Sequence, residues 1–185
     1  MNRLALCQLD AARWLKLSYD HLVLKLGAET NFFNLPGVRE RALTMKSLAD
    51  AFVLRNRALT MLELATVTQN ALVRRALMTF VVAGAGFAGV ETVGALNDFV
   101  REALGYYPAL SEDDLRVVLV HPGAVVLPEL GESLGRYAQA KLAARKVETR
   151  LEYVRQRPEL AARATPIVSP EQTQARLLPG GDGRL

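Results

Sequence analysis

Apolar and polar positions follow two different periods along the chain, and each change of period predicts an element. Apolar residues at helical spacing run from about Met45 to Thr66, with Ser47 or Thr44 as the N-cap, and a short helix is predicted over 71–76. No glycine or proline interrupts the chain from Met45 until Gly84. This stretch is therefore predicted to be helical and to lead into a region of a different pattern.

Residues 79–151 alternate between short apolar runs and helical patterns. Strands are predicted at 80–83, 115–120 and 147–151, and helices at 87–104 and 132–144. A β-α-β-α-β order forms a parallel sheet and is the mononucleotide-binding half of a doubly wound fold. The sequence therefore predicts an α/β protein with a Rossmann-like parallel sheet and flanking helices.

The two ends of the chain carry weaker patterns. Residues 1–20 show no strong period, 22–26 are predicted to form a strand, and the proline-containing stretch after Val154 predicts an irregular, poorly ordered tail. These changes divide the chain into three parts: 1–43, 44–154 with the connecting helix and the nucleotide-binding fold, and the tail 155–185.

Composition narrows the class of protein. Hydrophobic residues make up 50% of the 185 residues, which is enough for a core. No apolar run approaches the roughly 20 residues that a membrane helix needs. Asp10 and its polar neighbours interrupt the first residues, which argues against a secretory signal. We therefore expect a cytoplasmic protein.

Cysteine, histidine and charge exclude several kinds of site. The single cysteine, Cys7, excludes an internal disulfide framework, and two distant histidines argue against a metal centre, so no metal is predicted. The net charge of +4 comes from basic residues scattered along the chain, whereas nucleic-acid binding needs them clustered on one face. We expect no nucleic-acid partner. A weak attraction to an anionic membrane surface is compatible with this charge.

The glycine loop Gly84-Ala85-Gly86-Phe87-Ala88-Gly89 joins the strand 80–83 to the next helix, and it is the one GxGxxG motif in the sequence. Its three glycines allow a tight turn, the approach of backbone to a dinucleotide pyrophosphate, and close packing of helix on strand. Exposed amides at the helix N-terminus favour phosphate oxygens. The strand–turn–helix context therefore predicts a nucleotide site formed by Gly84, Ala85, Gly86, Phe87, Ala88, Gly89 and Val90.

Two polar residues near this loop each allow two interpretations. Glu91 either stabilises the helix dipole, by about 0.3–1 kcal/mol, or faces a nicotinamide. His121 follows the second strand, where an acid binds the adenosine ribose in NAD sites and basic residues suit a 2′-phosphate. A neutral His121 bonds either a ribose hydroxyl or only water. The choice between NADH and NADPH stays open.

Four stretches that follow one another along the chain resemble a single family: Tyr19–Phe33, Leu35–Leu59, Arg74–Leu96 and Val117–Leu151. In this order they are similar to the type II NADH dehydrogenases, which are FAD-dependent NADH:quinone oxidoreductases within the two-dinucleotide-domain flavoproteins. The first stretch resembles the end of the first FAD segment and the second resembles the connector to the NADH domain, so the resemblance makes residues 1–43 a remnant of the FAD-binding domain and connector. The third stretch contains the glycine loop and resembles the NADH-domain fingerprint. The fourth resembles the βαβ step that follows it.

The resemblance implies roles for particular residues. Gly84, Gly86 and Gly89 would bind the NADH pyrophosphate. Glu91, in the family's Gly-Val-Glu-Thr pattern, would lie near the nicotinamide, where hydride passes to FAD. His121 also occurs in similar bacterial members. For the complete enzyme the resemblance implies quinone as electron acceptor and peripheral attachment to the cytoplasmic face of the inner membrane, and it says nothing of the oligomeric state.

Departures from the family pattern are as informative as the matches. No FAD glycine motif precedes Gly84, so we expect an incomplete two-dinucleotide-domain flavoprotein that binds NAD(H) but not FAD by itself. Lys25 stands in an apolar strand, and Lys146 replaces a usual glycine.

We expect this chain to be the NADH-binding portion of an oxidoreductase and to be inactive in isolation. The alternative is a truncated, non-catalytic nucleotide-binding module. A methyltransferase using S-adenosylmethionine is disfavoured, because His121 stands where it needs an acid.

Overall fold

The computed structural model describes residues 2–8, 13–21, 23, 29–32 and 37–152 and divides into two units, Met1–Thr30 and Asn31–Leu185. The predicted strand at 22–26 (apart from residue 23), Lys25 within it, and the tail 155–185 lie outside the described residues.

The first unit holds an antiparallel pair of strands, β1 (Asn2–Gln8) and β2 (Arg13–Tyr19). Its register places Leu4 opposite Leu17 and Leu6 opposite Leu15. The sequence analysis found no element here. Leucines at every second position carry the period of a strand, but over too few residues to predict a hairpin by themselves.

The second unit begins with three helices: α1 (Val38–Arg41), α2 (Leu48–Val67) and α3 (Ala71–Leu77). The start of α2 is set by a capping box. The Asp50 backbone N–H donates to Ser47 Oγ at 3.2 Å, and the Asp50 carboxylate accepts from the Ser47 N–H at 2.9 Å. Of the two predicted N-caps, Ser47 is therefore confirmed.

A parallel sheet follows, with strand order β3-β4-β5: β3 (Thr79–Ala83), β4 (Arg116–Val120) and β5 (Val147–Arg150). The crossover helices are α4 (Phe87–Leu104) and α5 (Glu132–Ala144), and two 3₁₀ turns lie at Glu112–Asp114 (η1) and Pro128–Leu130 (η2). The register pairs Phe80 with Val117 and Val117 with Val147. The predicted α/β class is confirmed, and each predicted strand and crossover helix lies within one residue of its observed bounds.

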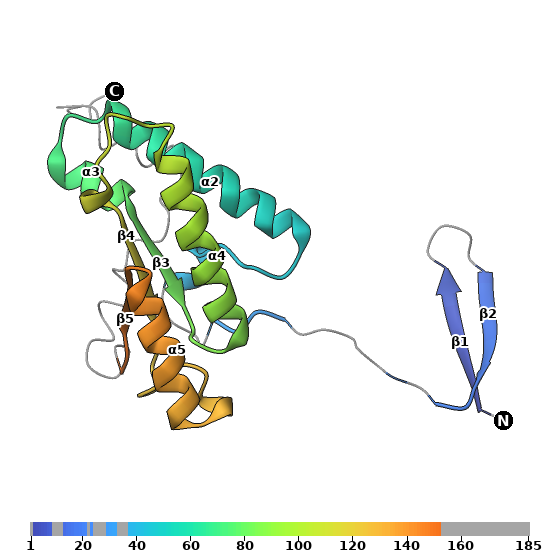
Figure 1. Ribbon diagram of the computed structural model, residues 1–185. Coiled ribbons are helices and arrows are strands. Elements are labelled where there is room, and N and C mark those ends of the chain that lie inside the picture. Colours follow the sequence, from blue (N-terminus) through green and yellow to red (C-terminus); the bar gives the residue numbers. More distant parts are fainter. Residues whose placement is uncertain (1, 9–12, 22, 24–28, 33–36, 153–185) are drawn as a thin grey trace. The chain divides into compact units, whose positions relative to one another are not determined.

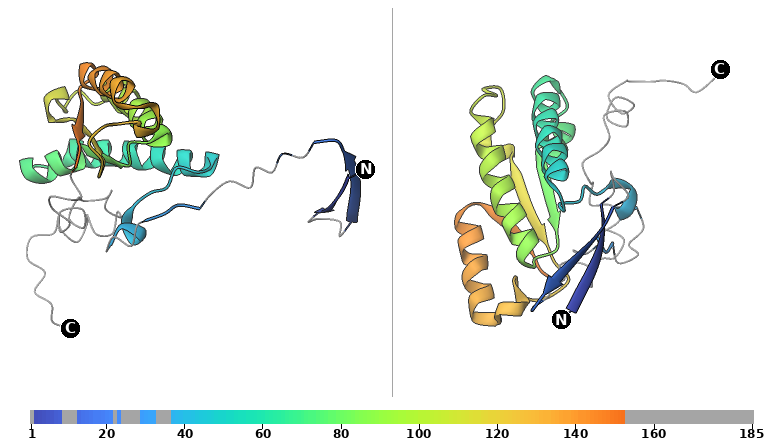
Figure 2. Two further views of the ribbon diagram at one scale, coloured as in Figure 1. Left: turned by 90° about the horizontal axis from the view of Figure 1, so that it is seen from below. Right: turned by 90° about the vertical axis from the view of Figure 1, so that its right-hand side faces the viewer.

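Helices α4 and α5 lie over the same face of this sheet (Figures 1 and 2). Both α4 and α5 pack on the sheet, while α2 runs beside α4 and α3 adjoins β3. Parallel strands hold their carboxyl ends at one edge, so the turns after β3 and β4 meet there. The sheet therefore places the glycine loop beside the segment that leaves β4.

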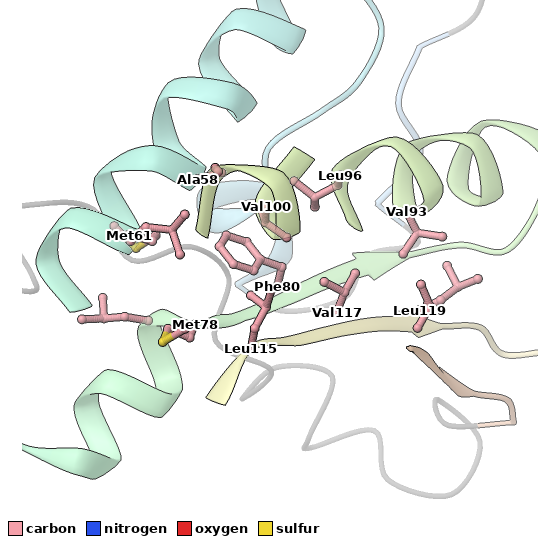
Figure 3. Close-up of a cluster of buried hydrophobic side chains, with 14 of the residues drawn as sticks. Ala58, Met61, Met78, Phe80, Val93, Leu96, Val100, Leu115, Val117 and Leu119 are labelled. Atoms are coloured by element: carbon pink, nitrogen blue, oxygen red, sulfur yellow. The ribbon is translucent and has the colours of Figure 1, made fainter. Parts of the chain in front are cut away.

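The core lies between the sheet and the helices (Figure 3). Phe80 and Val117 from the strands meet Val100 from α4 and Met61 from α2, and all four side chains are at most 3% exposed. Burying side chains of this size contributes about 1.5–3 kcal/mol each. The core thus fixes α4 on the sheet, and with it the helix start at the glycine loop.

In the part of the chain that the structure describes, no helix is long and apolar enough to cross a membrane. No group of three or more His, Cys, Asp or Glu side chains among those residues could hold a metal ion.

Candidate functional site

The conformation and close packing of the backbone require glycine at two positions of the loop. Gly84 has φ of +99°, in the region that side chains disfavour, and its N–H donates to the Val120 carbonyl at 2.9 Å. Gly89 sits so close to this turn that a Cβ there would lie 1.7 Å from the Gly84 carbonyl oxygen. The first turn of α4 therefore packs directly against the end of β3, as the glycine pattern predicts.

The third glycine, Gly86, leaves open space instead. It is the N-cap residue of α4, and no side chain caps that end of the helix. A Cβ on Gly86 would meet only the Glu129 carboxylate oxygen Oε1, at 3.8 Å. Backbone N–H groups in the first turn of such a helix lack intrahelical partners and sit at the positive end of the dipole. Gly86 therefore places no side chain beside the N–H groups of Phe87 and Ala88 at the start of α4.

Both backbone groups of Ala85 form hydrogen bonds with the segment that follows β4. Its side chain is fully buried, its N–H donates to His121 Nδ1 at 3.2 Å, and its carbonyl accepts from the Leu127 N–H at 2.8 Å. Both backbone groups of Ala85 are therefore used within the protein. Ala85 offers no free backbone donor to a ligand and instead ties the loop to the segment after β4.

His121 is the first residue after β4, and its own N–H donates to the Arg150 carbonyl at 3.0 Å. Burial lowers the pKa of the His121 imidazole, and the nearby Glu129 carboxylate acts in the opposite direction. Because Nδ1 accepts a hydrogen bond, the ring is neutral with its proton on Nε2. Only Nε2–H remains for a ligand, and it lies near Gly123, whose Cβ would be 2.9 Å from it.

The residues from His121 to Gly131 form a crossing segment that runs past the glycine loop to the start of α5. Val126 and Leu127 within it are buried, and Leu127 adopts a left-handed φ of 49°. A Cβ on Gly135 of α5 would lie 2.4 Å from the Val126 carbonyl oxygen. Close backbone packing therefore fixes this segment between the glycine loop and α5.

The structure brings together only some of the predicted site residues. Gly84, Ala85, Gly89 and His121 are in mutual contact through the backbone and hydrogen bonds described above. Val90 is half-buried, and its N–H donates to the Gly86 carbonyl at 3.0 Å. The exposed residues at the start of α4 are Phe87, Ala88 and Glu91. Glu91 has no ion pair or hydrogen-bonded side chain among the described residues.

The sequence analysis missed Glu129. It lies in η2, an exposed turn with neither strand nor helix period, and its place beside Gly86 depends on how the crossing segment folds back. Pro128 and Gly131, on either side of it, are local signs of a turn but do not indicate where that turn lies.

Comparison with known proteins gives consistent relatives. Residues 3–165 match the profile of the pyridine nucleotide-disulphide oxidoreductase family. The type II NADH:quinone oxidoreductases NdhA and Ndh of Mycobacterium tuberculosis are 35% and 36% identical to this chain over 134 residues. A solved structure of NDH2 from Plasmodium falciparum in complex with NADH shares the fold, with a TM-score of 0.64 and 23% identity over 80% of this chain.

These matches cover most of this chain but a minor part of each relative. The two mycobacterial alignments span 72% of this chain and 28% and 29% of the relatives, and the structural match spans 30% of the Plasmodium protein. The family profile, in contrast, covers well over half of the chain. This chain belongs to the pyridine nucleotide-disulphide oxidoreductase family, and within that family it is similar to the type II NADH:quinone oxidoreductases.

Proposed function

We propose that residues 79–151 are the NADH-binding portion of an FAD-dependent NADH:quinone oxidoreductase. The observation that carries this proposal is the start of α4 at Gly86, which no side chain caps. The glycines at 84 and 89 allow this start to pack directly against the end of β3. Free amides at this point favour the pyrophosphate of a dinucleotide. The mycobacterial relatives named as NADH:quinone oxidoreductases support NADH as that dinucleotide.

Each residue of the loop has its own part in this proposal. Gly86 leaves room for the pyrophosphate, the amides of Phe87 and Ala88 donate to it, and Ala85 and His121 hold the loop in shape. Glu91 lies near the nicotinamide according to the family resemblance, and its exposure on the second turn of α4 leaves it free to do so. The chemistry that the nucleotide supplies when bound is donation of a hydride.

Flavin binding does not follow from the described residues. The one GxGxxG motif of the sequence is assigned to the nicotinamide nucleotide, and we derive no contact to FAD from any other residue. Hydride transfer to FAD, reduction of quinone and peripheral attachment to a membrane are therefore proposed for the complete family enzyme. A stoichiometric yellow flavin on the purified chain would contradict this division and make turnover by the chain itself expected.

A fluorescence titration with NADH tests the site. We expect the wild-type chain to bind NADH and Gly86→Val to weaken binding about tenfold or more, or about 1.4 kcal/mol. Gly86 has an ordinary φ of −74° and only a flexible carboxylate near its Cβ position, so this variant should still fold. Ala140→Val, on the exposed side of α5, is the matched control and should bind as the wild type does. Equal affinity of wild type and Gly86→Val would contradict the site.

The role of Glu91 needs its own comparison. Glu91→Gln should change the affinity for NADH but leave that for ADP-ribose unchanged, because ADP-ribose lacks the nicotinamide. A change of the same size for both ligands would place Glu91 away from the nicotinamide.

A further inference from the structure

The end of β4 lacks the group that usually selects between NADH and NADPH. An acid at this position accepts hydrogen bonds from the adenosine ribose, and a basic residue nearby suits the 2′-phosphate of NADPH. Here the position holds His121, whose Nδ1 already accepts from the Ala85 N–H. Its imidazole is neutral, so it supplies neither a carboxylate for the ribose nor a cation for a phosphate.

Another acid, Glu129, lies near both the glycine loop and the end of β4. Glu129 Oε1 is 3.8 Å from the place where a Gly86 Cβ would stand, so the carboxylate borders the space assigned to the nucleotide. The same carboxylate interacts electrostatically with His121. Glu129 is therefore close both to the pyrophosphate end of the loop and to the end of β4.

Hydrogen bonds on both sides of Glu129 fix the backbone of the turn that carries it. The Leu127 N–H donates to the Ala85 carbonyl at 2.8 Å, and the Leu130 N–H donates to the Leu127 carbonyl at 2.9 Å. The side chain itself is exposed, and it makes no hydrogen bond or ion pair with the described part of the chain. Its two oxygens are thus free to accept from a ligand.

Arg150, the basic residue hydrogen-bonded to His121, already forms an ion pair. Arg150 is joined to His121 through the backbone, and its guanidinium pairs with Glu148 at 3.2 Å. Glu148 in turn holds Arg116 at 2.7 Å in a bidentate pair. An added 2′-phosphate would therefore meet the Glu129 carboxylate without a free cation from Arg150 to offset it.

We propose that Glu129 takes the place of the missing acid after β4, accepting from the adenosine ribose hydroxyls and selecting a free 2′-hydroxyl over a 2′-phosphate. This inference rests on the proposed nucleotide site and adds that the site is specific for NADH. Coulomb repulsion between the carboxylate and a phosphate acts against NADPH, while hydrogen bonding favours NADH.

The test is calorimetric titration of ADP-ribose and 2′-phospho-ADP-ribose into the full chain at low salt. We expect the wild type to prefer ADP-ribose by about tenfold or more, and Glu129→Gln to lose most of that preference, a change of about 1.4 kcal/mol for each factor of ten. Glu132→Gln is the matched control, because Glu132 is an exposed acid three residues away that pairs with Arg136. It should keep the wild-type preference.

The outcomes separate the two proposals. A Glu129→Gln chain that binds both ligands with the wild-type ratio contradicts the role of Glu129 alone. Equal tightening for both ligands would also contradict it, since the carboxylate would then merely compete with the pyrophosphate for the start of α4. If the wild type binds neither ligand, the nucleotide site itself fails, and the selectivity with it. Thermal unfolding of each variant confirms that the exposed substitutions leave the fold intact.

Discussion

The two halves of α4 are joined to the protein by different means. At its N-terminal end α4 begins without a side-chain cap, and two glycines bring it against β3. In its C-terminal half, Asn97 is only 1% exposed, donates from Nδ2 to the Arg145 carbonyl at 3.1 Å and accepts from Arg101 Nε at 3.0 Å. Arg101 reaches Glu112 at 2.7 Å, and Lys146 reaches the same carboxylate at 2.9 Å.

This difference assigns ligand binding to the N-terminal half of α4 and stability to its C-terminal half. Asn97, the buried polar side chain of the C-terminal half, has its hydrogen bonds made within the protein, as buried groups require. The N-terminal half has glycines where side chains would otherwise pack or cap the helix, so the N–H groups of its first turn have no partner within the described part of the protein. A helix anchored at one end can therefore present its other end to a phosphate without being loosened by it.

The largest effect is expected from Gly89→Ala. Its Cβ would lie 1.7 Å from the backbone oxygen of Gly84, which cannot rotate away, so α4 must move off β3. We expect a loss of about 3 kcal/mol in the free energy of unfolding, measured by urea denaturation. Gly86→Ala is the control with open space at its Cβ, and a similar loss there would show that the close approach at Gly89 is not the cause.

A smaller loss is expected at the other half of the helix. Asn97→Ala removes both hydrogen bonds and leaves the Arg145 carbonyl and the Arg101 guanidinium short of a partner. The expected cost is about 2 kcal/mol in urea denaturation. Asp98→Ala, an exposed neighbour that pairs with Arg145, should cost no more than about 1 kcal/mol. Equal costs would mean that burial of Asn97 does not matter.

The two halves should also respond to acid at different pH. Folding lowers the pKa of His121 through burial, so its contribution is complete above about pH 6.5 and is lost as pH falls through the folded value. Folding lowers the pKa of Glu112 through its hydrogen bond with Lys146, so that contribution is complete above about pH 4.5 and is lost only below it.

Unfolding free energies at several pH values separate the two groups. The difference between wild type and His121→Asn should shrink between about pH 7 and pH 5, while that between wild type and Glu112→Gln stays constant there and shrinks only in stronger acid. Parallel changes in both differences would contradict the assignment of the two titrations to the two halves.

The smallest effect is expected at Lys146. It has a left-handed φ of +63°, where glycine is favoured, but it also pairs with Glu112. Lys146→Ala loses the pair and keeps the strain, whereas Lys146→Gly loses the pair and relieves it. Thermal unfolding should find Lys146→Gly more stable than Lys146→Ala by about 1 kcal/mol. The reverse order would show that the backbone there is not strained.

Local patterns in the sequence were sufficient for much of this fold. The period of α4 and α5, the apolar runs of the strands and the Ser47 cap are local signals, and each predicts its element closely. The glycines at 84 and 89 also predicted their own close packing. The hairpin of β1 and β2 and the position of Glu129 were not predicted. The first has too short a pattern, and the second depends on how the crossing segment returns to the loop, which no local period encodes.

The most direct test of the central claim is a two-dimensional ¹H–¹⁵N NMR titration of the labelled chain with NADH. We predict that backbone amide shifts change for residues 84–90 and His121 and stay constant for residues 97–103, in the anchored half of α4. Absence of any change, or changes confined to residues 97–103, would contradict a nucleotide site at the glycine loop.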